Sequence, residues 1–118
     1  FIMPNSVTSV GYSAFQNCSA LKTVKFSDGL GVINDHVCQG CSALEQLQLP
    51  ANLKTIYYAS FDGTSSLKKV EIPNSVNEIR PYAFQNSSID TLKLPISMQY
   101  LYRYAFNSCK NLKFVNLI

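Results

Sequence analysis

The chain has 118 residues, of which 47% are hydrophobic and only 14% are charged, with a formal net charge of +3. This length and composition predict one domain with an ample core. The lysines are scattered rather than gathered in a run, so a nucleic-acid partner is not expected. No apolar stretch approaches the roughly 20 residues that span a bilayer, so membrane insertion is not expected either.

One motif recurs along the whole chain. The stretch 72–94, I-P-N-S-V-N-E-I-R-P-Y-A-F-Q-N-S-S-I-D-T-L-K-L, matches again on both sides of itself. A fixed period of 22 or 23 residues is typical of a solenoid. We therefore predict a single right-handed solenoid over 1–118 with five repeats, 4–26, 27–49, 50–72, 73–94 and 95–117.

Neither end of the chain has the polar terminal repeat that an isolated solenoid needs. We expect a segment of a longer array, with any signal or anchor outside it, and a tendency to associate end to end through unpaired strand edges.

The first apolar cluster of each repeat has the pattern L-x-x-V-x-F. Its last two apolar positions alternate, as in a short strand with one buried face. We expect these strands to stack in register as one parallel β-sheet on the concave face. The apolar positions are Leu21, Val24 and Phe26, then Leu44, Leu47 and Leu49, then Leu67, Val70 and Ile72, then Ile89, Leu92 and Leu94, then Leu112, Val115 and Leu117.

The second cluster should form the convex side. Its spacing predicts a short extended piece, a turn, and one turn of 3₁₀ or α helix around Ala14-Phe15, Ala83-Phe84 and Ala105-Phe106. Pro81 suits the first position of a helical turn. Its apolar residues are Val7 and Val10, Leu30 and Ile33, Leu53 and Ile56, Val76 and Ile79, Met98 and Leu101, followed by Phe15, Phe61, Phe84 and Phe106.

Turn residues join the two clusters. Pro4, Pro50, Pro73 and Pro95 should end the ladder because proline has no N–H to donate. Repeat two differs, with Ser27-Asp28-Gly29 in place of the proline and Val37-Cys38 in place of Ala-Phe. The missing ring predicts a looser convex side in that repeat.

The consensus L-x-x-V-x-I-P-x-x-V-x-x-I-x-x-x-A-F, with Cys or Ser three residues after the Phe, resembles the BspA-type leucine-rich repeat. The resemblance covers all five units. It implies an α/β solenoid with the strands on the concave side, in a secreted or cell-surface protein that holds host or matrix proteins. The chain departs from the usual I-G, since only Gly11 keeps the glycine and Asn34, Tyr57, Arg80 and Tyr102 stand elsewhere.

Strand alternation sends two side chains of each repeat outward. These ten residues, which we call the concave face, are the predicted protein-binding residues, because a solenoid binds through such an extended face. They are Thr23, Lys25, Gln46, Gln48, Lys69, Glu71, Thr91, Lys93, Phe114 and Asn116.

Cys38-Gln39-Gly40-Cys41 has a spacing that also occurs in zinc and redox sites. However, Cys41 shares a repeat position with Cys18 and Cys109, which favours buried free thiols; a disulfide is the alternative. With His36 as the only histidine and no carboxylate set apart, we expect no catalytic, cofactor or metal site, and the chain is not expected to be an enzyme.

Two further features of the sequence, the sequons and the tyrosines, can each be interpreted in two ways. Asn17 and Asn86 begin N-glycosylation sequons, but the repeat consensus alone produces them. The tyrosines of the last three repeats either contribute to recognition or cover apolar coils. They are Tyr57, Tyr58, Tyr82, Tyr100, Tyr102 and Tyr104.

The sequence thus predicts a non-catalytic protein-interaction module, with adhesion through the concave face. The alternatives are a structural spacer that displays other domains, and a metal- or redox-dependent regulator that uses Cys38, Cys41 and His36.

Overall fold

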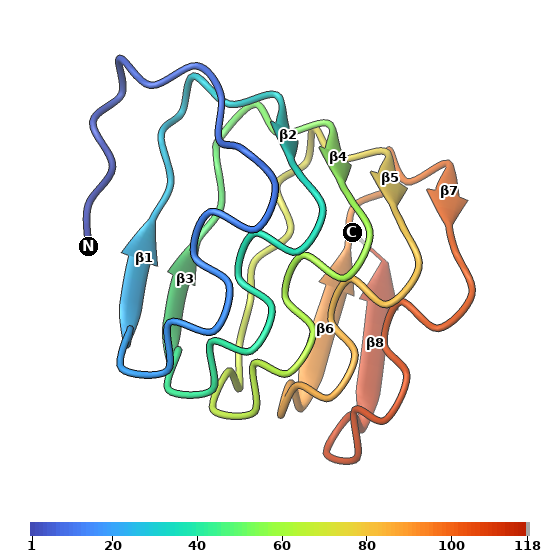
Figure 1. The fold of residues 1–118 in the computed structure, drawn as a ribbon. Helices are drawn as coiled ribbons and strands as arrows, with labels where there is room; N and C mark the ends of the chain where they lie inside the picture. Colours follow the sequence, from blue (N-terminus) through green and yellow to red (C-terminus); the bar gives the residue numbers. More distant parts are fainter. Residues whose placement is uncertain (118) are drawn as a thin grey trace.

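The computed structural model describes the backbone of residues 1–117 and the side chains of residues 1–113. The chain winds into coils that lie side by side in sequence order from the N-terminus to the C-terminus (Figure 1). The stack measures 34 × 29 × 20 Å. No helix among the described residues is long and apolar enough to cross a membrane.

The strands of the concave face are β1 (Thr23–Lys25), β3 (Gln46–Gln48), β6 (Thr91–Leu94) and β8 (Phe114–Leu117). They are parallel, as predicted, but they do not form one sheet. β1 pairs with β3 and β6 pairs with β8, and no described strand lies between the two pairs.

The interruption falls on residues 69–72 of repeat three. No backbone hydrogen bond joins this stretch to β3 or β6, although just before it Asp90 N donates to Lys68 O at 3.2 Å. The next coil is one residue shorter in the loop before Ile89, whereas the spacing to the preceding coil is the full 23 residues. The sheet of the concave face is therefore split at repeat three.

The second extended pieces of repeats two to five form a sheet of their own. β2 (Val32–Ile33), β4 (Thr55–Ile56), β5 (Glu78–Ile79) and β7 (Tyr100–Leu101) are parallel and follow one another in that order (Figure 1). Ile33, Ile56 and Ile79 are in register and fully buried. The short extended piece predicted for the second cluster thus builds one wall of the core.

The helical turns predicted for the convex side are absent from residues 1–117, where hydrogen-bonded turns take their place. The second residue of each turn has φ between 53° and 64° (Ser13, His36, Ala59, Tyr82 and Tyr104), outside the right-handed helical range. Turn N–H groups also bond to the following coil, as from Phe61 N to Ala83 O and from Phe84 N to Ala105 O, at 2.7 and 2.8 Å. An α helix would need those donors for its own carbonyls.

Phenylalanine rings form a column through the core. Phe84 stacks on Phe61 at 5.2 Å and on Phe106 at 5.4 Å between ring centroids. Cys38 takes the ring position in repeat two, and there Phe26 meets Phe61 edge-on at 6.2 Å. Cys38 has no exposed surface, so the core is closed to solvent at that position, and the looser packing of repeat two stays a prediction.

Every coil turns at the proline position. Val7 N donates to Pro4 O at 3.1 Å, and the same bond recurs in each repeat. In repeat two, Ser27 Oγ donates to Val7 O at 2.7 Å. Gly29 follows because a Cβ there would lie 2.8 Å from the same carbonyl oxygen. Ser27-Asp28-Gly29 thus preserves the turn without proline.

Candidate protein-binding face

The structure places eight of the ten predicted concave-face residues on strands β1, β3, β6 and β8, whereas Lys69 and Glu71 lie in the stretch that forms no strand. Thr23 is in register with Gln46, and Lys25 with Gln48. Most of the described side chains are exposed, and Lys25 is half-buried. Phe114 and Asn116 belong to β8, but their side chains lie outside the described set.

A hollow of about 1010 Å³ lies on this face at the split. Five predicted residues line it, and its apolar lining includes Leu47 of β3 and Val70 of the stretch that forms no strand. An adjoining hollow of about 440 Å³ adds Gln46. The five are Gln48, Lys69, Glu71, Thr91 and Lys93. Thr23 and Lys25 lie on β1 and contribute to neither hollow.

The hollow carries charges of both signs. Lys69 and Lys93 face it together with Glu71, Asp28 and Asp90. Among the described residues the one ion pair within 4.0 Å joins Arg80 to Glu78, so these five charges have no ionic partner inside the protein. They are available to a partner's charges.

The backbone at the split makes no ladder hydrogen bonds. In residues 69–72 neither N–H nor C=O groups bond to a neighbouring coil. This stretch lies between the coils of β3 and β6, so it is not a free sheet edge (Figure 1). What the hollow offers to a partner is therefore its charged side chains.

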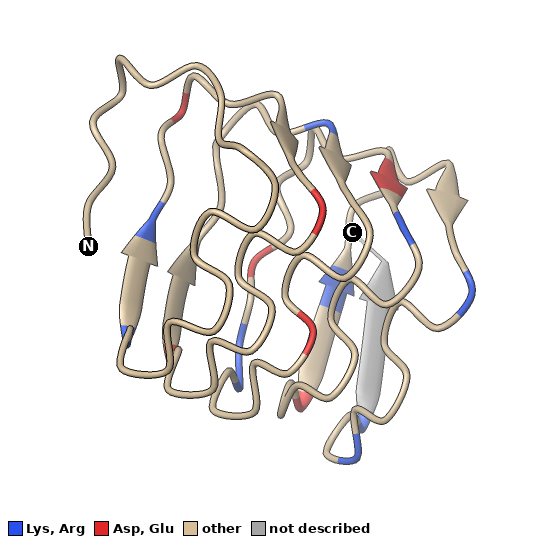
Figure 2. Ribbon diagram, viewed as in Figure 1, with Lys and Arg blue, Asp and Glu red and all other residues tan. Residues whose placement is uncertain are grey.

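Sequence analysis missed Asp28 and Asp90 as lining residues. Asp90 did leave a signal, because positive and negative residues alternate along the edge where the concave strands begin (Figure 2). That row comprises Lys22, Glu45, Lys68, Asp90 and Lys113. The split in the sheet left no signal in the sequence, because Leu67, Val70 and Ile72 keep the apolar pattern of the other repeats.

The four cysteines are free thiols. Cys41 Sγ donates to Phe15 O at 3.1 Å, and Cys109 Sγ donates to Phe84 O at 3.2 Å. Hydrogen bonding to Cys41, followed by burial, raises the pKa of Cys38 well above its ordinary value. A protonated thiol is a poor nucleophile and a poor metal ligand. Cys41 and Cys109 thus satisfy carbonyls of the preceding coil.

His36 lies on the convex side, half-buried, with Nδ1 2.9 Å from Gln39 Oε1 and its ring edge-on to Tyr58. No group of three or more His, Cys, Asp or Glu side chains within the described part of the chain is arranged to hold a metal ion. Asn17 and Asn86 are exposed; Asn86 Nδ2 donates to Asp62 Oδ1 at 3.3 Å. Their glycosylation stays a prediction.

Comparison with known proteins identifies the repeat. The family model for the BspA type leucine rich repeat region matches residues 1–113 in six copies, one more than the five units delimited from the sequence. A search of curated proteins finds no match.

Solved bacterial structures share the fold. A leucine-rich repeat protein from Bacteroides ovatus is 29% identical with a TM-score of 0.90, over 94% of this chain and 29% of its own. The leucine-rich repeat protein of T. pallidum is 27% identical with a TM-score of 0.92, over 97% of this chain and 56% of its own. A leucine rich cell surface protein from Faecalibacterium prausnitzii is 26% identical with a TM-score of 0.92, over 99% of this chain and 31% of its own. The chain thus spans about a third to a half of these proteins.

Proposed function

Because the chain belongs to the BspA-type leucine-rich repeat family, we propose that it binds a partner protein on its concave face. Leucine-rich repeat modules generally mediate protein–protein interaction and are generally non-enzymatic. The observation that carries the proposal is the hollow at repeat three, where Lys69, Glu71 and Lys93 meet unpaired backbone.

The lining favours an extended protein segment with side chains of both charges. Such a segment lies along the hollow, with its side chains alternating between the lining and solvent. Lys69 and Lys93 attract acidic side chains, while Glu71 selects a basic one between them. Apolar residues such as Leu47 and Val70 accept small hydrophobic groups.

We further propose that the partner is a host or matrix protein and that the module acts in adhesion, displayed on a cell surface or secreted. The support is the similarity to a protein from Faecalibacterium prausnitzii that is described as a leucine rich cell surface protein.

The test is capture from a matrix and serum extract by immobilised chain. The variant Lys69→Ala/Glu71→Ala/Lys93→Ala should lose the captured protein at physiological salt, because both the charges and the hollow's polar rim are removed. A matched control, Lys54→Ala/Lys110→Ala, removes two exposed lysines that line neither hollow and should retain it. Equal capture by all three proteins would refute the concave site and favour the structural spacer.

We also propose that the isolated chain associates end to end. Leu101 on strand β7 is 48% exposed, and Ile2 near the other end is 72% exposed. Each lies on an outer coil with strand groups open to pairing. Light scattering should therefore show a mass that rises with concentration, and a constant monomer mass would contradict this.

A further inference from the structure

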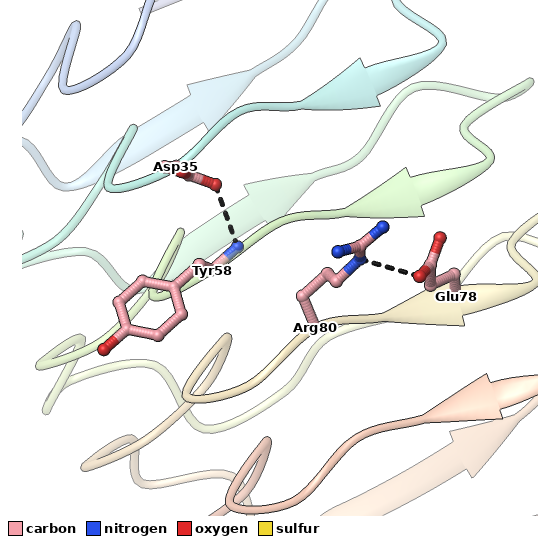
Figure 3. Close-up of polar contacts among 4 residues, drawn as sticks. All are labelled: Asp35, Tyr58, Glu78 and Arg80. Atoms are coloured by element: carbon pink, nitrogen blue, oxygen red, sulfur yellow. Dashed lines mark hydrogen bonds and ion pairs between the residues drawn. The ribbon is translucent and has the colours of Figure 1, made fainter.

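The convex side holds an arginine between two tyrosine rings. The guanidinium carbon of Arg80 lies 5.2 Å from the ring centre of Tyr57 and 5.5 Å from that of Tyr102. Arg80 directly follows β5 and reaches back to Glu78, with Nε 2.7 Å from Oε2 (Figure 3). The Nε–H is not aimed at that oxygen, so the contact is an ion pair rather than a hydrogen bond.

The outer edge of this guanidinium is unsatisfied. No acceptor among the described residues binds its two terminal nitrogens, and the side chain is 41% exposed. The two rings hold the guanidinium in place by cation–π contact. An arginine held in this way presents a fork whose geometry matches a carboxylate.

More tyrosines surround the arginine. Tyr82 has Tyr58 on one side and Tyr104 on the other, each at 5.4 Å between centroids. Tyr100 packs on Tyr102 at 6.4 Å and is itself 57% exposed. Because neighbouring rings cover the face of Tyr82 and because Arg80 covers those of Tyr57 and Tyr102, little open ring face is left for stacking a sugar. A partner protein, in contrast, can bind through the ring edges and hydroxyl groups that stay accessible.

We propose that Tyr57, Arg80, Tyr100 and Tyr102 form a second protein-binding surface, separate from the concave face, that receives an aspartate or glutamate carboxylate of a partner protein on Arg80. Charge selects this partner, because the one acid in the cluster, Glu78, is already paired through Nε. Tyrosine and arginine are also the residue types enriched among the residues that dominate binding energy at protein interfaces.

The experiment is selection of random dodecapeptides displayed on phage against the immobilised chain, followed by affinity measurement with synthetic peptides. Selected peptides should contain an acidic residue whose exchange for Gln or Asn weakens binding at least tenfold, because the bidentate contact is lost. Arg80→Lys keeps the charge but loses the fork, and it should weaken the same peptides similarly. The concave variant Lys69→Ala/Glu71→Ala/Lys93→Ala should bind them unchanged.

Thermal unfolding of Arg80→Lys verifies that this variant is folded, and exchange of the peptide's acid tests the contact with the protein unaltered. The proposal is overturned when no peptide is enriched, when the acid is dispensable, or when binding depends on the concave residues instead. Because the last outcome leaves the concave site intact, failure here is distinguishable from failure of the proposed function.

Discussion

Replacing Gly40 by alanine should destabilise the fold through two separable terms. The first is backbone conformation, since Gly40 has φ +75°, where an L-residue costs about 1–2 kcal/mol. The second is contact, because the new Cβ would lie 2.2 Å from Asn17 Oδ1. Asn17 is exposed, so its side chain can move, at roughly 0.5–1.5 kcal/mol for an unfavourable rotamer.

Gly63 isolates the first term. It has φ +80°, but the atoms nearest to a Cβ there are 3.5 Å away. Alanine also lowers the conformational entropy of the unfolded chain, and this recovers about 0.4–1 kcal/mol of unfolding free energy in each variant. We therefore expect losses in unfolding free energy of about 1 kcal/mol for Gly63→Ala and about 2 kcal/mol for Gly40→Ala. Gly31→Ala, with ordinary φ and no atom within 4 Å, should be neutral or slightly stabilising.

Urea unfolding of the three variants checks these values, and the double variant Asn17→Ala/Gly40→Ala completes a cycle that isolates the contact. Equal stability of all three single variants would refute the conformational argument. A Gly40→Ala loss that stays the same in the Asn17→Ala background would refute the contact.

Two other predictions follow from the core. Phe84→Ala should cost about 3–5 kcal/mol of unfolding free energy, because the ring is fully buried between two others. Phe15 is only half-buried, so Phe15→Ala should cost less. Comparable losses for the two variants in urea unfolding would contradict a stabilising role of the stacked phenylalanine rings. Iodoacetamide should modify exposed Cys18 but not Cys38 in the folded chain, as mass spectrometry can show.

Periodicity was sufficient to predict the core. Leu44, Leu67 and Ile89 recur at one repeat position, and all are fully buried. Burial of an apolar residue depends on which side of the coil it occupies. In a chain of fixed repeats, the position of the residue within its repeat determines that side. The five i to i+3 turns at the proline position were likewise predictable from local turn chemistry.

The convex turns were mispredicted because Ala-Phe after a proline suggests a helix, whereas Tyr82 and Tyr104 adopt positive φ, which bulky residues seldom do. A signal was present four residues later, where Asn17, Gly40, Gly63 and Asn86 tolerate such values.

The concave face was predictable as a set of outward positions but not as a hollow. Whether Val70 joins a ladder depends on the register between coils, which side-chain patterning within one repeat does not encode. Predicting the contact of Arg80 with two tyrosine rings would need the same information, because the two tyrosines come from the repeats before and after it.

The turn-to-turn hydrogen bonds on the convex side all run in one direction along the solenoid. Donors at Phe15, Cys38, Phe61 and Phe84 point to the following coil, whereas coil-to-coil bonds elsewhere, such as Tyr57 N to Ile33 O, point to the preceding one. The row of turns is therefore left with N–H groups at the edge of the last coil and C=O groups at the edge of the first. Two stacks that meet head to tail set these donors against acceptors, whereas the other end-to-end arrangements oppose like groups. A head-to-tail contact does not close on itself by a two-fold axis, so such association extends a filament instead of stopping at a symmetric dimer.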